Sequence, residues 1–579
     1  MPNMIQNAKD SISQILNAAY QKAAEKGELP AGAALSGTVE IPKDSANGDF
    51  AANHAMAGAK ALHMAPRKIA ETLIANADLA NTWFASVEVA GPGFINFRLA
   101  DRWYADVLQA VTREGADYGR SDIGHGQKVM VEFVSANPTG PMHMGNARGG
   151  VLGDALASVL DRAGYQVWRE FYVNDAGNQI EKFANSIDAR YQQLLLGEEQ
   201  VAFPEDGYHG DDIKDLAKLF YEANGDKYLT VPVAERHQAM AEFGLQRNIP
   251  KMQEDLRRYG IEYDRWFFES ELHESGYVAE SVQKLTDRGY TYEKDGALWL
   301  KTSQILAEQL LKAGKKQEEI DKLELKDDVL RRANGFYTYF AADIAYHRNK
   351  LEKRGFDKVI NVWGADHHGH VARLKGAMDA LGLDGEHRLD IVLMQLVKLT
   401  RNGEVVRMSK RTGKAISLTD LLDEIPVDAA RYFFNSRPES PVEFDLELAI
   451  RQDSENPVYY VQYAHARICT LLSALAAEGH TVPASADAAL LSTAEEKELI
   501  KQLAALPEEI RLAARDYDPS RINRYVTELA ARFHRFYTVC RIKGAESDVQ
   551  AARLLLADCV RRVIAVSLGI IGVTAPEKM

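Results

Sequence analysis

The chain has 579 residues, of which 46% are hydrophobic and 26% charged, and 83 acidic against 69 basic residues give a formal net charge of −14. This composition is typical of a folded globular protein and excludes a disordered or collagen-like chain. Because a single hydrophobic core stops growing at about 250–300 residues, the length requires at least two domains. The most apolar stretch, 563–573, is too short to cross a bilayer, and residues 1–16 do not have the pattern of a secretory signal.

The cysteines give no sign of a metal site or a disulfide framework. Cys469, Cys540 and Cys559 lie far apart and form no CxxC pair or zinc-ligand spacing. We therefore expect a reduced, cytoplasmic protein without zinc and without membrane attachment.

Charge is distributed unevenly along the chain. Residues 451–579 carry 16 basic and 16 acidic side chains, so the entire net charge resides in residues 1–450, and the segment 511–562 has 11 basic against 6 acidic residues. A basic C-terminal segment on an acidic body could bind a polyanion at one place. A solvated, arginine-rich helix face explains the same charges equally well.

The first 118 residues are predicted to form a small α+β domain. An amphipathic helix opens the chain, a second is expected over about 66–75, and the run 86–99 alternates like two strands around a Gly–Pro–Gly turn. The segment 115–127, rich in Gly and Asp, resembles a linker.

A parallel α/β domain is predicted over 126–395. The apolar run KVMVEFVS (128–135) is typical of a strand buried on both faces, a helix follows over about 151–160, and VWREFYV (167–173) is the next strand. Such a unit predicts parallel strands joined by a right-handed crossover. Neither GxGxxG nor GxxxxGK[ST] occurs, which argues against a dinucleotide site and a P-loop.

The remaining segments complete an expected α/β architecture with several domains. Residues 181–330 are polar, acidic and mostly helical, and we interpret them as an insertion within the α/β domain. The sheet resumes at 358–371 and at 391–397, a connecting region covers 396–455, and residues 456–579, punctuated by Pro457, Pro483 and Pro507, are predicted to form an all-α bundle. The fold prediction is therefore a Rossmann-like parallel-sheet domain with a helical insertion, an N-terminal α+β domain and a C-terminal helical bundle.

The turn PTGPMHMGN (138–146) follows the first buried strand and opens a helix. Helix N-termini carry unpaired N–H groups and partial positive charge, so anions bind there. Gly145 leaves room for a base or ribose, and His143 can direct an imidazole N–H at phosphate oxygens. Taken alone, a histidine at this position is more often a helix cap, but the preceding strand favours a nucleotide site.

A cationic loop, VRMSKRTG (406–413), is the second candidate. Its basic residues could close on a phosphate and stabilise charge that develops in the transition state. Basic residues beside a glycine are usually a solvated turn, so this loop gains meaning only together with the first motif.

The two motifs resemble the HIGH and KMSKS signatures of class I aminoacyl-tRNA synthetases, as HMGN (143–146) and RMSKR (407–411). Further segments resemble the arginyl-tRNA synthetase family almost throughout the chain, namely NGDFAANHAM, GPGFINFRL, SANPTGPMHMGNARGG, FYVNDAGNQI, GFYTYFAADIAYH, VWGADHHGHV, NPVYYVQYAHAR and the final APEKM. Two positions depart from the family pattern: Asn146 stands at the fourth HIGH position and Arg407 replaces the first lysine of KMSKS, which changes its donor geometry.

The resemblance implies an arginine–tRNA ligase that activates L-arginine with ATP and transfers it to the 3′-terminal ribose of tRNA(Arg). Activation is an in-line displacement at phosphorus, which needs positioning and charge neutralisation rather than a protein nucleophile. Catalytic roles fall on His143, Arg407 and Lys410. ATP contacts fall on His143, Gly145, Asn146, Gly364, Asp366, Met408, Ser409 and Lys410. We expect Mg²⁺ to be held mainly by ATP oxygens and water, without protein ligands.

The same resemblance places the arginine substrate against Glu132, Asn137, Tyr339, Asp343 and His370. A carboxylate matches the guanidinium fork, and Tyr339 and Asp343 are four residues apart, on one face of a predicted helix. Glu132 would be costly in an apolar strand without a partner. Tyr339 could instead be a core residue and His370 a structural histidine. The cluster of His367, His368 and His370 lacks a metal-binding spacing.

The C-terminal bundle resembles the anticodon-binding domain of the family. Stacking on RNA bases is assigned to Tyr459, Tyr460 and Tyr463, and phosphate contacts to Arg532, Arg535 and Arg541. We expect the protein to act as a monomer.

Three other functions stay open from the sequence. A class I synthetase for another amino acid would use Asp343 structurally, and a nucleotidyltransferase would use the HxG turn on a small phosphorylated substrate. An inert RNA-binding paralogue would lack catalysis, which the retained His143, Gly145 and Lys410 argue against.

Overall fold

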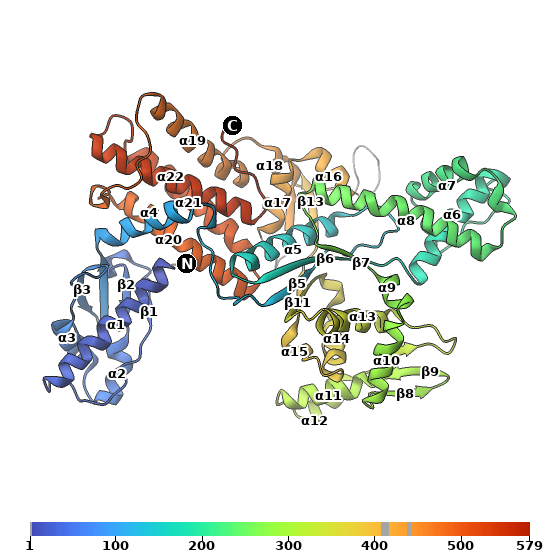
Figure 1. The fold of residues 1–579 in the computed structure, drawn as a ribbon, viewed down its shortest axis with the longest axis horizontal. Coiled ribbons are helices and arrows are strands. Elements are labelled where there is room, and N and C mark those ends of the chain that lie inside the picture. The colour runs from blue at the N-terminus through green and yellow to red at the C-terminus, as the bar shows by residue number, and fades with distance from the viewer. Residues whose placement is uncertain (1–2, 407–415, 437–441) are drawn as a thin grey trace.

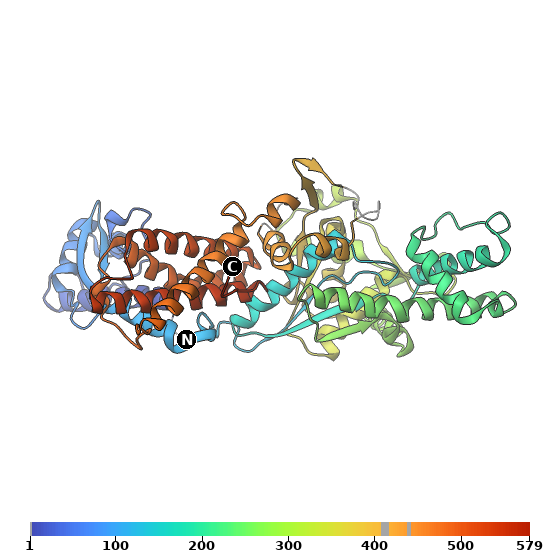
Figure 2. The ribbon, with the colours of Figure 1, turned by 90° about the horizontal axis from the view of Figure 1, so that it is seen from above.

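The computed structural model describes residues 3–406, 416–436 and 442–579, and it is elongated (Figure 1). The N-terminal domain and the helices α6 and α7 lie at opposite ends of the molecule in both views (Figure 2). Across these described ranges, no helix combines the length and apolar character needed to cross a membrane.

The N-terminal part is the predicted α+β domain. Its antiparallel strands pair in the order β1-β2-β4-β3. The helix that opens the chain buries Ile5, Ile12 and Leu16, and the two strands around the Gly–Pro–Gly turn are present, so these predictions are confirmed. Its elements are α1 (Met4–Glu25), β1 (Val39–Glu40), β2 (Phe50–Ala52), α2 (His54–Leu62), α3 (Pro66–Asn76), β3 (Phe84–Ala90) and β4 (Phe94–Leu99).

Helix α4 (Asp101–Glu114) connects this domain to the rest of the chain and packs against the C-terminal helices α20 and α22. In the segment 115–127 that follows, Tyr118 is buried and its hydroxyl donates to the Leu503 carbonyl at 3.0 Å. This hydrogen bond fixes part of the glycine-rich segment on the C-terminal bundle.

A parallel sheet in the order β12-β11-β5-β6-β7 forms the centre. Val129 and Val131 of β5 pack in the same core as helix α5, whereas Met130 packs in the core of α13 and α14. Helices therefore cover both faces, which explains the unbroken apolar run of β5. The elements are β5 (Lys128–Glu132), α5 (Met144–Arg162), β6 (Gln166–Val173), β7 (Arg265–Phe268), α13 (Tyr339–Arg348), β11 (Lys358–Gly364), α14 (His368–Ala380), α15 (Gly385–Arg388) and β12 (Leu389–Met394).

The predicted strand over 391–397 is in fact split between two sheets. Strand β12 ends at Met394, and β13 (Val397–Arg401) belongs to a second sheet in the order β14-β13-β15. The buried Arg148 donates to the carbonyls of Gln395 at 2.6 Å and Leu396 at 3.2 Å, so these groups are unavailable to a neighbouring strand. The other strands of this sheet are β14 (Glu404–Val405) and β15 (Val442–Asp445).

The region 181–330 contains mostly helices, but strand β7 within it completes the central sheet and was not predicted. A small antiparallel sheet in the order β10-β9-β8 also lies there. The elements beside β7 are α6 (Asn178–Leu196), α7 (Asp211–Asn224), α8 (Val233–Arg258), α9 (Glu269–Glu274), α10 (Tyr277–Asp287), β8 (Thr291–Lys294), β9 (Ala297–Leu300), α11 (Thr302–Lys312), α12 (Gln317–Ile320) and β10 (Asp328–Arg331).

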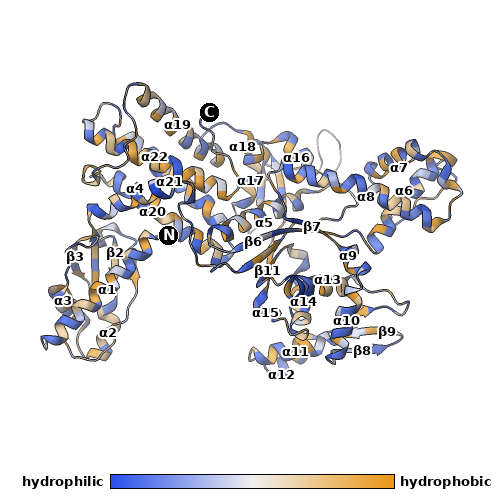
Figure 3. Ribbon diagram, in the orientation of Figure 1, coloured by the Kyte–Doolittle hydropathy of each residue, from blue (hydrophilic) through white to orange (hydrophobic). Residues whose placement is uncertain are grey.

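The chain ends in the predicted helical bundle, whose helices are amphipathic (Figure 3). Pro457 opens α19, as expected for proline at a first helical position, but Pro507 lies inside α20 and does not end it, contrary to the interpretation of it as punctuation. The elements are α16 (Leu418–Glu424), α17 (Val427–Asn435), α18 (Leu446–Ile450), α19 (Pro457–Ala477), α20 (Ala494–Asp516), α21 (Ser520–Val539) and α22 (Ser547–Ile570).

A buried arginine joins three distant parts of the chain. Arg431 on α17 forms an ion pair with Asp154 on α5 and donates to the carbonyls of Tyr259 at 3.0 Å and Ile571 at 3.2 Å. The guanidinium is fully buried, and a Cβ at Gly572 would collide with it. Arg431 therefore connects three parts of the structure: helix α5, the end of α8 and the C-terminal bundle.

Candidate active site

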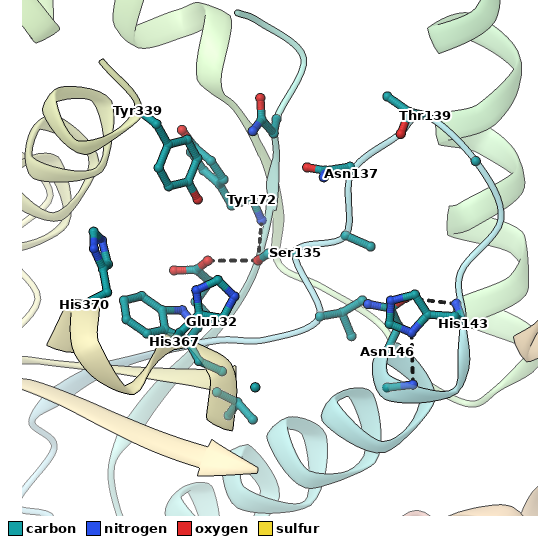
Figure 4. A pocket seen from close by; sticks show the side chains of 18 of the residues that line it. Glu132, Ser135, Asn137, Thr139, His143, Asn146, Tyr172, Tyr339, His367 and His370 are labelled. Carbon is teal, nitrogen blue, oxygen red and sulfur yellow. Dashed lines mark hydrogen bonds between the residues drawn. The ribbon is translucent and has the colours of Figure 1, made fainter. Parts of the chain in front are cut away.

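A cavity of about 1160 Å³ opens at the carboxyl ends of β5 and β11. Ligands of open parallel sheets bind at this edge. The cavity is lined by residues predicted to contact ATP and by residues predicted to contact arginine: Glu132, Asn137, His143, Gly145, Asn146, Tyr339, Asp343, Gly364 and His370. Figure 4 shows Tyr339, His370 and Glu132 toward one side and Asn137, His143 and Asn146 toward the other.

His143 occupies the N-cap position of α5. Its Nδ1 accepts from the Gly145 amide at 3.1 Å, and the Asn146 side-chain oxygen accepts from the His143 amide at 2.9 Å. Although the residue is exposed, desolvation of the ring lowers the pKa of His143, so the imidazole is neutral at pH 7. With Nδ1 accepting, Nε2 carries the hydrogen and can donate to a phosphate oxygen.

Gly145 is required by the imidazole itself. A Cβ built at this position would lie 3.0 Å from Cε1 and 3.2 Å from Nδ1 of His143. A glycine at position 145 was predicted to give a base or ribose access to the backbone. The structure adds a second reason, which is the close approach of the His143 ring. Asn146 likewise uses its oxygen in capping the helix.

The turn at His143 is paired with the chain that follows the cationic loop. His143 and Ser417 form an antiparallel β-bridge, and the Leu418 amide donates to the Met142 carbonyl at 2.9 Å. Four predicted residues of the loop, Arg407, Met408, Ser409 and Lys410, lie outside the described residues, and so does the side chain of Asp366.

Helix α13 brings Tyr339 and Asp343 to the same cavity, as their spacing of four residues predicts. Asp343 is 6% exposed. Burial raises the pKa of Asp343, while the hydrogen bond from His370 at 2.9 Å opposes that shift. Tyr339 is 58% exposed, so it is not a core residue. The charge of Asp343 and then desolvation of the hydroxyl raise the pKa of Tyr339, so its hydroxyl keeps its proton and can donate.

His370 contacts Asp343 directly, at the side of the cavity opposite His143. Its ring packs against Phe340, with centroids 5.2 Å apart, and against Trp363, with centroids 5.7 Å apart. The histidine is therefore held against the carboxylate assigned to the guanidinium.

Glu132 has a protein partner for its buried charge. Lys350, which is fully buried, donates to Glu132 at 2.5 Å, and the Ser135 hydroxyl donates to the other carboxylate oxygen at 2.8 Å. Lys350 also donates to Asn361 at 3.2 Å. Burial lowers the pKa of Lys350, and the charge of Glu132 opposes that shift. Lys350 thus accounts for the burial of Glu132 that the sequence left unexplained.

The chain is strained directly after β5. Val134 and Ser135 have φ of 69° and 40°, and a β-branched residue rarely adopts positive φ. The Ser135 hydroxyl accepts from the Tyr172 amide at 3.2 Å while donating to Glu132, which fixes this conformation. Such strain is concentrated at functional sites.

Several cavity residues escaped the sequence analysis, because nothing in their local pattern separates them from ordinary helix or strand positions. Lys350, which does not line the cavity but pairs with Glu132, lies in the π-helical turn Asn349–Lys353 and is fully buried. For Arg373 alone the sequence offered a signal: it lies one helical turn after His370, so the two side chains share a helix face. The residues missed include Ser135, Thr139, Tyr172, Asn174, His347, Trp363, Arg373 and Leu396.

The residues predicted to contact tRNA lie on α19 and α21, except Arg541, which follows the end of α21. Tyr459 and Tyr463 stack with ring centroids 6.1 Å apart, and Tyr463 also stacks on His534. Tyr460 also packs against His534, with ring centroids 4.8 Å apart.

Of the predicted arginines, Arg535 and Arg541 are exposed. Arg532 is engaged in ion pairs with Glu498 at 2.9 Å and Glu528 at 2.8 Å.

Within ranges 3–406, 416–436 and 442–579, no group of three or more His, Cys, Asp and Glu side chains could hold an ion. A Mg²⁺ ion in this cavity would take its oxygen ligands from the nucleotide and water.

Comparison with known families agrees with this architecture. The chain matches the profile of the class I tRNA synthetase (R) catalytic domain over 107–442, the arginyl-tRNA synthetase N-terminal domain over 6–99 and the DALR anticodon-binding domain over 461–579.

Relatives named arginine–tRNA ligase extend over the whole chain. The protein from Acetivibrio thermocellus is 52% identical and that from Caldanaerobacter subterraneus is 54% identical, each over 100% of both chains. The crystal structure of a putative arginyl-tRNA synthetase from Campylobacter jejuni has a TM-score of 0.72 and 32% identity, covering 83% of this chain and 100% of that one. The Thermus thermophilus arginyl-tRNA synthetase shares the fold at a TM-score of 0.72 and 21% identity, with 99% and 100% covered. With matches in all three parts and half of its residues shared with full-length relatives, the chain belongs to the arginyl-tRNA synthetase family of class I synthetases.

Proposed function

We infer that this chain is an arginine–tRNA ligase. The observation that carries this inference is identity above 50% with curated arginine–tRNA ligases over the full length of both chains. A buried carboxylate, Asp343, in the cavity provides the chemistry that a guanidinium substrate requires.

The reaction has two steps. The carboxylate of L-arginine attacks the α-phosphorus of ATP, the bond to the bridging oxygen breaks, and pyrophosphate leaves with its electron pair. A hydroxyl of the 3′-terminal ribose of tRNA(Arg) then attacks the arginyl carbonyl, and AMP leaves. Both steps depend on alignment and charge stabilisation within one cavity.

We assign the arginine end of the cavity to the side formed by α13 and β5. Asp343 accepts the guanidinium, and Tyr339 adds a hydroxyl one helical turn away. Glu132, whose charge is shared with Lys350, and Asn137 receive the α-ammonium and carboxylate end. His370 supports this end by its contact with Asp343.

We assign the nucleotide end to the N-terminus of α5. The Nε2–H of His143, held by the amide of Gly145, donates to phosphate, and Gly364 at the end of β11 approaches the ribose. Asp366 completes the ribose contact. Asn146 supports this end by capping the turn.

The cationic loop supplies the remaining charge. Lys410 and Arg407 are assigned to neutralise the triphosphate, and Met408 and Ser409 are assigned to contact ATP. The β-bridge between His143 and Ser417 supports this assignment because it holds the end of the loop at the nucleotide turn. Mg²⁺ bound to the triphosphate adds charge stabilisation.

We assign tRNA binding to two surfaces, the N-terminal domain and the face of α19 and α21. The stacked rings of Tyr459, Tyr463 and His534 next to the exposed Arg535 support base stacking beside a phosphate contact. We place Arg541 among the phosphate contacts and Arg532, with its two carboxylate partners, at the edge of the surface. We expect a monomer acting in the cytoplasm, without zinc.

The direct test is ATP-dependent charging of unfractionated tRNA with labelled arginine. Charging that requires ATP and tRNA supports the inference, and omission of either is the control. Pyrophosphate exchange with each of the twenty amino acids, in the presence of tRNA, tests specificity. Equal exchange with lysine or glutamine would refute the arginine assignment, and exchange without tRNA binding would favour a nucleotidyltransferase.

A further inference from the structure

Helix α8 contacts both of the segments that meet at the nucleotide end of the cavity. In its second half, Asn248 Nδ2 donates to the Pro138 carbonyl at 2.9 Å, and Pro138 opens the turn that leads to His143. At its last residue, Arg258 Nη2 donates to the Leu422 carbonyl of α16 at 2.7 Å. Helix α8 therefore runs from the first motif to the helix that follows the cationic loop (Figure 1).

These contacts close a triangle of three segments. The β-bridge joins His143 of the turn to Ser417, which is the N-cap of α16. Pro138 lies five residues before His143, and Leu422 lies five residues after Ser417. Two segments joined only at a bridge can pivot about it. A helix that holds both of them away from the bridge, at points about 15 Å apart along its axis, removes that freedom.

The contact of α8 with α16 is a helix cap. The last carbonyls of a helix have no partner within it, and its C-terminus carries partial negative charge. The Arg258 guanidinium supplies a donor to the Leu422 carbonyl and pairs with Asp423 at 2.8 Å. A guanidinium has five N–H donors in a fixed fork, so it can serve both acceptors at once. Arg258 thus fixes the last turn of α16.

Apolar packing holds α8 in place between the two contacts. Met252 and Leu256 are buried in the same core as Leu418 of α16 and Met142 of the turn. Because Asn248 precedes Met252 by four residues, it lies on the same face of the helix. Apolar burial is not directional, whereas a hydrogen bond requires a defined geometry. The polar contacts therefore set the orientation of the turn and of α16 on this core.

We propose that Asn248 and Arg258 are positioning residues for ATP: by holding the turn and α16 on one helix, they keep the His143 imidazole aligned with the triphosphate. Neither residue is among the described residues that line the cavity, so each acts through His143. The proposal rests on the arginine–tRNA ligase function inferred above.

The direction of the imidazole depends on the backbone of the turn. Nδ1 of His143 accepts from the Gly145 amide, so the ring moves with this part of the chain. Activation requires in-line alignment, and a shift of about 1 Å can reduce the rate by about 100-fold. Loss of one contact with α8 leaves the bridge and the apolar core in place. We therefore expect a smaller shift and a smaller loss of rate.

The test measures pyrophosphate exchange by the full-length enzyme in the presence of tRNA, with ATP or arginine varied. Asn248→Ala and Arg258→Met each remove one contact of α8. Their matched controls are Gln246→Ala and Arg257→Met, because both residues are exposed, and Arg257 pairs with Glu254 of α8 itself. The thermal unfolding midpoint is measured for every variant.

We expect kcat/KM for ATP to fall about fivefold in Asn248→Ala and in Arg258→Met, while KM for arginine stays within about twofold. Both controls should match the unchanged enzyme. Arg258→Lys keeps the charge without the fork and should recover part of the loss. His143→Asn removes the imidazole and keeps an oxygen that can cap α5, so in this background either substitution should cost less than about twofold.

Two results would overturn the proposal. One is a rise in KM for arginine as large as the loss in kcat/KM for ATP, which would indicate a general disturbance of the cavity. The other is an undiminished loss in the His143→Asn background. If Arg258→Met unfolds, Asp423→Asn, which removes one partner of Arg258, must lower kcat/KM for ATP, and unchanged kinetics there count against the proposal. Failure of the proposed function is distinct, because the unchanged enzyme would then show no exchange with arginine.

Discussion

His143 and Ser417 face each other in an antiparallel β-bridge, although 138–146 opens the first crossover helix and Ser417 follows the cationic loop. The loop therefore returns to the chain beside the helix N-terminus that is assigned to phosphate. Ser417 is fixed as the N-cap of α16, whose amide at Asp420 donates to its hydroxyl at 3.1 Å. The chain that follows the loop is thus held by two contacts, the β-bridge to His143 and the cap of α16.

The role assigned to Lys410 predicts the effect of removing this lysine. Lys410→Ala should lower kcat of arginine activation about 100-fold or more and change KM for ATP much less, because its charge acts chiefly on the transition state. Pyrophosphate exchange at varied ATP gives both parameters. Lys398→Ala, an exposed lysine on the neighbouring strand β13, is the matched control and should leave both unchanged. An unaltered kcat in Lys410→Ala would contradict the assigned role.

The guanidinium assignment is tested at Asp343. Asp343→Asn keeps the size of the side chain and removes its charge, so KM for arginine should rise about 100-fold, the equivalent of one strong charge-assisted hydrogen-bond pair. KM for ATP should stay within about twofold. Asp295→Asn, in the exposed turn between β8 and β9, provides a control for loss of an acidic side chain. Comparable losses for arginine and ATP would show that Asp343 supports the fold of the cavity instead.

The close contact at Gly145 predicts a defect confined to the nucleotide end. Gly145→Ala places a methyl group 3.0 Å from Cε1 of His143, so the ring must shift by a few tenths of an ångström, which weakens the hydrogen bond from the Gly145 amide to Nδ1. We expect kcat/KM for ATP to fall about tenfold, with KM for arginine little changed. Gly569→Ala in α22 meets no atom within 4 Å and should be neutral or slightly stabilising. Equal kinetics for the two variants would refute this reading of the turn.

Glu170, on strand β6 of the central sheet, should make the free energy of unfolding depend on pH. It is fully buried, and its carboxylate accepts from Arg354 at 2.8 and 2.5 Å and from the Tyr346 hydroxyl at 2.7 Å. Burial alone would raise the pKa of Glu170, but the hydrogen bonds and charge of Arg354 outweigh it, so the pKa lies below the usual value.

A lowered carboxylate pKa stabilises the folded state above the pKa of the unfolded chain, and this stability is lost as the pH falls through the folded-state pKa. Glu170→Gln should therefore destabilise the protein at pH 7 by about 3–5 kcal/mol, because Arg354 loses its partner, and the difference should shrink below about pH 4. Unfolding midpoints measured across pH 3.5–7 give the comparison. Glu71→Gln, in an exposed pair with Arg67, should match the unchanged protein at every pH.

Much of the fold could be predicted because apolar runs and helical stripes are local properties of the sequence. The strand at 128–132 and the helix after it follow directly from the pattern of Val129, Val131 and Val151. Strand β7 could not be predicted, because its four residues, RWFF, lie between helical segments and gain their partner only from β6. The break at Gln395 depends on Arg148, a residue almost 250 positions earlier.

In the candidate site, too, local motifs could be predicted and long-range contacts could not. Motifs identified the residues that the cavity gathers, such as His143 and Asp343, because their chemistry is visible in the sequence. Their partners were not visible. Lys350 beside Glu132 and Arg373 beside His370 are ordinary basic residues of a helix until the fold buries or orients them.

The junction at Arg431 has a mechanical consequence. A rotation of the C-terminal helices against the central sheet would strip a fully buried guanidinium of Asp154 or of the Ile571 carbonyl, which costs several kcal/mol. The contacts of Arg431 therefore resist displacement of the C-terminal helices relative to α5, so the bundle and the central sheet are rigidly connected at this junction.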